Sequence, residues 1–60
     1  MFYIWNRKNA KLMKTPEVIV DNWTNYVPSA WGYATMKEAK KMSAHLRRLG
    51  MNVSIVEFNI

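Results

Sequence analysis

The sequence lacks cysteine altogether, and it has few glycine, histidine and acidic residues. Without cysteine, neither a disulfide nor a thiolate metal site can support the 60-residue chain. Two glycines are too few for a glycine-rich phosphate-binding loop. No apolar run approaches the roughly 18 residues that a membrane span needs. We therefore expect a cytoplasmic protein that makes no membrane contact.

The groups that catalysis requires are also scarce. His45 is the only histidine, and the four carboxylates, at Glu17, Asp21, Glu38 and Glu57, are scattered along the chain. A carboxylate pair works as an acid and a base only when two such groups meet and their pKa values are pushed apart. No spacing of histidines or acids matches a metal-binding motif. The sequence predicts a binding protein with no catalytic residue, no metal site and no cofactor.

Positive charge and aromatic side chains are abundant. Nine lysines and arginines against four acids give a net charge of +5, and the aromatics are three Trp, three Tyr and two Phe. A chain of this length forms one domain, residues 1–60, with a small core, so some aromatics are needed inside it. The charge favours contact with polyanions or with acidic protein surfaces.

The first half of the chain predicts two strands. Residues 2–7 are rich in β-formers, with Phe2 and Ile4 on one face and Tyr3 and Trp5 on the other. Both faces are apolar, so alternation does not say which is buried. A break at Thr15-Pro16 precedes residues 17–23, which we predict as the second strand, joined to the first by a hairpin.

The second half predicts one helix between extended segments. Residues 29–34 form either a short strand or an extended lead-in to the helix. Thr35 and Glu38 have the spacing of a capping box, and Gly50 stands where a helix would end, so we predict a helix over residues 36–49. Residues 51–60 predict a last strand in which the apolar set changes face after Ile55. That change indicates a bulge or a strand covered on both faces.

These elements predict an α+β domain of the order β-β-(β)-α-β. Its three- or four-stranded, mainly antiparallel sheet would carry the helix on one face. The residues expected to form the apolar stripe of the helix step by three and four. They are Ala39, Met42, Leu46 and Leu49.

The helix face opposite this stripe is the first candidate binding surface. It gathers cations and no acid, which is unusual for a face that serves only solubility. Its residues are Lys37, Lys40, Lys41, Arg47 and Arg48. Such a face could bind phosphates or an acidic protein groove, or it could be merely solvated.

The aromatics are the second candidate surface, since one helix covers only one face of a sheet. Aromatics beside cations stack on bases or anchor protein interfaces, although they could also fill the core. The candidates are Tyr3, Trp5, Trp23, Trp31 and Tyr33.

Residues 31–39, with Gly32-Tyr33-Ala34-Thr35 leading into Glu38-Ala39, resemble the strand-to-helix join of AP2-like and arm-type DNA-binding domains of phage integrases. In that family a three-stranded sheet reads the DNA major groove. The resemblance implies that the sheet contacts DNA and gives weight to Lys8, Lys11 and Lys14. That domain lacks a strong strand after the helix, which this sequence has.

The order of elements across residues 2–60 is similar to that of small phage host-takeover proteins. It consists of two strands, a helix that begins with Thr-x-x-Glu-Ala, and a last segment with Gly50, Val53 and Val56. One type of these proteins inhibits the host RNA polymerase. The resemblance implies a phage-encoded, non-catalytic module that binds a host protein, but it transfers no particular residue.

We therefore predict a small cytoplasmic binding protein that modulates a host macromolecule, foremost a host protein with an acidic surface. The alternatives are a DNA- or RNA-binding module and a structural homodimer formed through the open sheet face or an edge strand.

Overall fold

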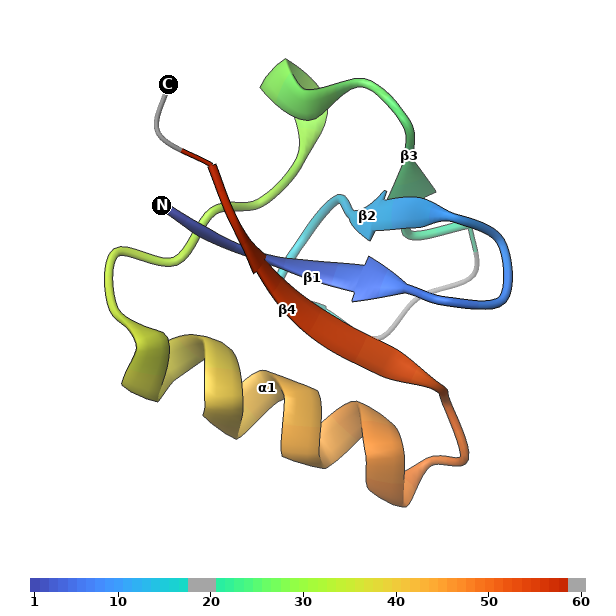
Figure 1. Cartoon of the computed structure of the whole chain (residues 1–60). Helices are drawn as coiled ribbons and strands as arrows, with labels where there is room; N and C mark the ends of the chain where they lie inside the picture. Colours follow the sequence, from blue (N-terminus) through green and yellow to red (C-terminus); the bar gives the residue numbers. More distant parts are fainter. Residues whose placement is uncertain (18–20, 59–60) are drawn as a thin grey trace.

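In the computed structural model, which describes residues 1–17 and 21–58, the first strand of the sequence lies inside the sheet (Figure 1). The four strands are antiparallel in the order β3-β2-β1-β4, and one helix packs against one face of the sheet. The predicted α+β fold is confirmed. The elements are β1 (Phe2–Asn6), β2 (Lys11–Met13), β3 (Trp23–Thr24), the 3₁₀ helix η1 (Val27–Ser29), α1 (Met36–Arg48) and β4 (Val53–Glu57).

The second strand is not where the sequence predicted it. A turn over residues 7–10 leads directly from β1 into β2, with Asn6 Oδ1 accepting a hydrogen bond from the Lys8 amide at 2.9 Å. Ala10 completes the turn in the left-handed region, with φ 58°. Residues 18–20 of the strand predicted over residues 17–23 lie outside the described part of the chain. Of the four described residues of this range, only Trp23 lies in a strand.

The buried side chain of Asn22 explains why Thr15 and Glu17 are not in a strand. Its Oδ1 accepts hydrogen bonds from the backbone amide and the hydroxyl of Thr15, both at 2.8 Å. Its Nδ2 donates to the carbonyls of Thr15 and Glu17, at 2.9 and 2.7 Å. A side chain that bonds nearby backbone groups competes with a sheet ladder for them. Asn22 therefore holds residues 15–17 in a loop.

Helix α1 begins at the predicted residue and ends at Arg48, one residue earlier than predicted. Thr35 is its N-cap, and the Thr35 hydroxyl accepts the Glu38 amide at 3.3 Å. At the other end the Gly50 amide bonds Arg47 O at 3.0 Å and the Met51 amide bonds Leu46 O at 3.1 Å. With Gly50 at φ 89°, this is the Schellman arrangement that satisfies the last carbonyls of a helix.

The side of α1 that faces the sheet differs from the predicted stripe at its end. Ala39, Ser43 and Leu46 are buried, and Met42 is half-buried against the core. Leu49 is 54% exposed, so its predicted place in the stripe is wrong. As the C-cap it has left helical geometry, with ψ 3°, so helical spacing no longer sets its direction. Ser43, which was not predicted in the stripe, lies on the buried side of the helix.

The core lies between α1 and one face of the sheet. Antiparallel partners share a face, so Ile4, Ile55, Met13 and Trp23 lie together on the side of α1. The buried core residues are Ile4, Met13, Tyr33, Ala39, Leu46 and Val53.

The other face of the sheet is also covered. Tyr3 is 6% exposed and Leu12 is 2% exposed, and η1 lies on the side of the sheet away from α1 (Figure 1). Gly32 approaches the Tyr3 ring so closely that a Cβ at this position would lie 3.1 Å from it. The rings of Tyr3 and Phe58 are 5.5 Å apart. This face is therefore not an open aromatic surface.

The two segments around α1 resolve alternatives that the sequence left open. The lead-in to α1 contains η1 and a single bridge, between Tyr33 and Phe2, so it is an extended lead-in and not a third strand. The pairing of β4 with β1 runs without interruption from Phe2↔Glu57 to Asn6↔Val53. The change of apolar face after Ile55 therefore reflects a strand covered on both faces and not a bulge.

Candidate functional site

The five predicted cations are all exposed on α1, and four of them line two grooves on its two flanks. Lys41 and Arg48 line a groove on one flank of the helix, together with Tyr33. Lys40 and Arg47 line a second groove on the opposite flank, beside β4. Lys37 is exposed and lines neither groove. The helix thus directs its positive charge to two separate sites, one on each side of the exposed ridge.

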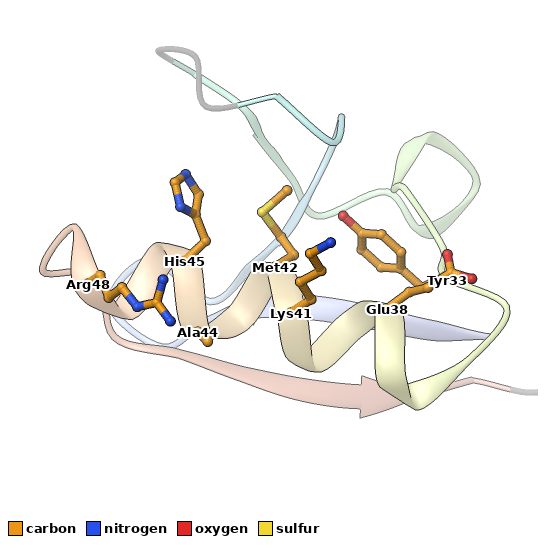
Figure 2. Close-up of a pocket in the computed structure, with 7 residues that line it drawn as sticks. All are labelled: Tyr33, Glu38, Lys41, Met42, Ala44, His45 and Arg48. Carbon is orange, nitrogen blue, oxygen red and sulfur yellow. The ribbon is translucent and has the colours of Figure 1, made fainter.

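The first site, which we call the Tyr33 groove, has a volume of about 620 Å³. Figure 2 shows the ring of Tyr33 and the side chains of Met42 and His45 on the same side of α1. Helical spacing of three and four places Lys41, His45 and Arg48 along one line of the helix. The lining residues are Tyr33, Glu38, Lys41, Met42, Ala44, His45 and Arg48.

The Tyr33 groove combines an apolar floor with a charged rim. Met42, Ala44 and the ring of Tyr33 supply carbon surface, whereas Lys41 and Arg48 supply positive charge. Glu38 is the only acid in the lining, and it lies in the first turn of α1. An apolar centre with a polar rim is the usual make-up of a protein-binding patch.

The hydroxyl of Tyr33 is the unusual polar atom of this groove. It is buried and has no hydrogen-bond partner in the described part of the chain. Burial raises the pKa of Tyr33 above its usual 10.0, and the nearby Glu38 carboxylate raises it further. A buried hydroxyl without a partner costs about 1–3 kcal/mol of stability. Buried polar groups nearly always have a partner in native proteins, so an unpaired one calls for an explanation.

The second site, which we call the β4 groove, has a volume of about 590 Å³. It lies between α1 and β4, and no carboxylate is among the described residues that line it. Arg47 donates a hydrogen bond from its guanidinium to the Val53 carbonyl at 3.1 Å, so this cation is tied to the start of β4. The lining residues are Met36, Lys40, Ser43, Ala44, Arg47, Ser54 and Ile55.

The candidate aromatic residues are dispersed. Trp31 is 43% exposed, whereas Trp5 and Trp23 are half-buried. Tyr3 and Tyr33 are buried, so neither is part of an exposed aromatic surface. Trp31 stands edge-on to Tyr33, with ring centroids 6.5 Å apart. The predicted set is thus reduced to one exposed ring, that of Trp31, because each side of the sheet has its own cover.

Sequence reasoning missed several residues of the two grooves. No binding role was predicted for His45, and Glu38 was predicted only as part of the capping box, yet both line the Tyr33 groove. Met36 and Ser43 on the other flank were not singled out. Glu38 and His45 are seven residues apart, as are Met36 and Ser43, so the sequence already placed each pair on one side of the helix. Tyr33 and β4, which complete the two grooves, could not be derived from this spacing.

Comparison with known proteins finds no match to a family model, to a curated protein or to a solved structure. Both resemblances noted in the sequence therefore stay predictions. Over residues 1–17 and 21–58, no helix is long and apolar enough to span a membrane. Within the same ranges, no three histidine or acidic side chains gather where they could hold a metal ion.

Proposed function

We propose that this domain is a non-catalytic binding protein that recognises an acidic segment of a partner protein through the Tyr33 groove. The observation that supports the proposal is the apolar floor of this groove, rimmed by Lys41, His45 and Arg48. A leucine or aromatic side chain of the partner would fill the floor, and flanking carboxylates would meet the cations. The resemblance to phage host-takeover proteins suggests a host protein in the cytoplasm as the partner.

The distribution of charge favours a protein over a nucleic acid. Nucleic-acid surfaces gather cations along one face, where they neutralise successive phosphates. Here the cations of α1 are divided between two flanks. Glu38 would also repel phosphates that approach the Tyr33 groove. The opposite sheet face offers no alternative surface for base readout, since Tyr3 and Leu12 are buried.

The Tyr33 hydroxyl gives the proposal a specific contact. Once the ring turns far enough to expose it, this buried hydroxyl can donate a hydrogen bond to a carboxylate or a carbonyl of the partner, which would satisfy an atom that has no partner in the described part of the free domain. Binding would then remove a cost that the free domain carries.

The test titrates the ¹⁵N-labelled domain with a short peptide that carries one leucine between glutamates. We expect the amide signals of Tyr33, Met42 and His45 to shift. Replacing Lys41 and Arg48 together by glutamine should weaken binding about tenfold, since each exposed charge contact contributes up to about 1 kcal/mol. Lys37→Gln is the matched control, because Lys37 is exposed and lines neither groove.

Two results would contradict the proposal. In the first, the peptide shifts no amide signal of the Tyr33 groove, or Lys37→Gln weakens peptide binding as much as the double replacement of Lys41 and Arg48. In the second, random-sequence duplex DNA binds more tightly than the peptide and loses affinity steeply with salt. That result would favour the nucleic-acid alternative.

A further inference from the structure

Strand β4 leaves one edge of the sheet without a partner strand. Its neighbour on the inner side is β1, and no strand in the described part of the chain lies beyond it. Asn52 and Phe58, at the two ends of β4, bond to Arg7 and Met1 at 2.9 and 3.0 Å. Backbone groups in antiparallel pairs alternate in direction. Ser54 and Val56 therefore face β1, and the amides and carbonyls of Val53, Ile55 and Glu57 face outward.

Arg47 covers only the beginning of this edge. Its guanidinium bonds the outward carbonyl of Val53 at 3.1 Å. In the part of the chain that the structure describes, no hydrogen bond engages the outward groups of Ile55 and Glu57. Unpaired groups of this kind form a template for another strand.

The β4 groove lies directly beside these unpaired groups. Ile55 belongs to the edge and also lines the groove, opposite Lys40 and Arg47 of α1. A residue paired with Ile55 on an added strand would share its face and would point toward the same two cations. Met36 and Ala44 add carbon surface that the stem of such a side chain can cover. Backbone pairing and charge thus favour one kind of occupant.

We propose that an extended acidic segment of a partner protein adds to β4 as a further antiparallel strand, with its carboxylates directed at Lys40 and Arg47. This inference rests on the proposed function, since it assigns to the acidic partner a second segment and a binding mode. Main-chain hydrogen bonds to Ile55 and Glu57 provide affinity, and the two cations select the acidic side chains.

The charges of the edge also set the position of the segment, and the net charge of the domain disfavours a second copy of this chain as its occupant. Glu57 lies at the far end of the edge, so the acidic residues of the partner belong opposite Val53 and Ile55. Two copies paired through β4 would bring together cations of like sign, in a protein with a net charge of +5. A strand with carboxylates on one face meets no such repulsion.

The probe is a short peptide of alternating glutamate and valine, mixed with the full-length ¹⁵N-labelled domain. We expect the Ile55 and Glu57 amides to exchange with solvent at least about tenfold more slowly when the peptide is bound. The same peptide with N-methyl groups on the backbone of its glutamates keeps every charge but cannot form the main-chain hydrogen bonds to β4. It should therefore leave the exchange of the Ile55 and Glu57 amides unchanged. Lys40→Gln should weaken binding several-fold without unfolding the domain, because Lys40 is exposed.

The outcomes separate this proposal from the proposed function. If the alternating peptide leaves the Ile55 and Glu57 amides unprotected, or if the N-methylated peptide binds equally well, strand addition is wrong. The proposed function then still stands if the leucine-glutamate peptide shifts Tyr33, Met42 and His45. Glutamine at Lys41 and Arg48 is the matched control, since these changes lower the charge on the opposite flank and should leave the protection of Ile55 intact.

Discussion

At the scale of single residues, Tyr33 connects stability with binding. Its hydroxyl is buried without a partner among the described residues, so Tyr33→Phe should raise the free energy of unfolding by about 1 kcal/mol. If this hydroxyl serves the partner, the same variant should bind the leucine-glutamate peptide more weakly. Chemical denaturation and peptide titration of one sample measure both effects. A residue with a structural role only would not change stability and affinity in opposite directions.

The raised pKa of Tyr33 also predicts how stability depends on alkaline pH. The folded state holds the phenol proton more tightly than the unfolded chain, whose pKa is near 10.0. The contribution of Tyr33 to stability is therefore complete below about pH 10 and is lost as the pH rises toward the raised pKa of the folded state. Denaturation at a series of pH values should show a smaller alkaline loss for Tyr33→Phe.

In contrast to the unpaired hydroxyl of Tyr33, both polar atoms of the Asn22 side chain make hydrogen bonds. Asn22→Ala should lower the free energy of unfolding by about 2 kcal/mol or more, because it leaves the amide of Thr15 and the carbonyls of Thr15 and Glu17 without their partner. Thermal or urea unfolding measures the loss. Asn25→Ala, at an exposed asparagine, should change stability by no more than about 0.5 kcal/mol. Equal effects of the two changes would show that the Asn22 amide contributes little.

At the scale of elements, the turn between β1 and β2 contains a residue that is poorly suited to it. Ala10 has φ 58°, a conformation that costs a residue with a Cβ about 1–2 kcal/mol. Ala10→Gly should therefore stabilise the domain by about 0.5–1 kcal/mol, measured by urea unfolding. Ala44→Gly, in the middle of α1, is the matched control and should destabilise it by about 1 kcal/mol. If both glycine variants are less stable than the unmodified domain, the turn does not strain Ala10.

The elements also show which parts of the fold could be predicted from the sequence. Helix α1 could be predicted because its ends depend on local chemistry, at Thr35 and Gly50. Strand β2, over Lys11–Met13, could not, because three residues are too few to show an alternating pattern. The strand predicted over residues 17–23 is wrong at Glu17 and at residues 21–22, because the β-preference of the segment says nothing of the hydrogen bonds that Asn22 makes with Thr15 and Glu17.

The candidate site was predictable to a similar degree. The cations were correctly placed on the exposed side of α1, since helical spacing decides this. Their division into two grooves depends on which elements pack beside the helix, and it could not be derived from spacing alone. Tyr33 lies outside the helix and reaches the groove through its bridge to Phe2, a contact between residues far apart in the sequence.

At the scale of the whole molecule, the open edge of β4 raises the question of self-association. We predict that the domain sediments as a monomer at micromolar concentration, because two copies that each carry a net charge of +5 repel one another. Lys40→Val removes one of these charges and adds a β-former, and it should promote dimers. Lys37→Val is the matched control, because it makes the same change away from both grooves.

Equal association of the two valine variants would show that general surface hydrophobicity, and not the edge of β4, drives the effect. A dimeric unmodified domain would favour the homodimer alternative. Raising the salt concentration weakens the repulsion between like charges, so dimers of the Lys40→Val variant should also increase with salt.

The pairing of β1 with β4 has a consequence for how the protein is made. The Met1 amine bonds the Phe58 carbonyl at 2.8 Å across a separation of 57 positions, and the sheet is incomplete without this pairing. While the ribosome is still at work, Phe2 and Ile4 have emerged but their partners Glu57 and Ile55 have not. The domain therefore completes its fold only after β4 has left the ribosome, in one late step that depends on contacts of high sequence separation. Until then, its apolar first strand is exposed to chaperones and to neighbouring nascent chains.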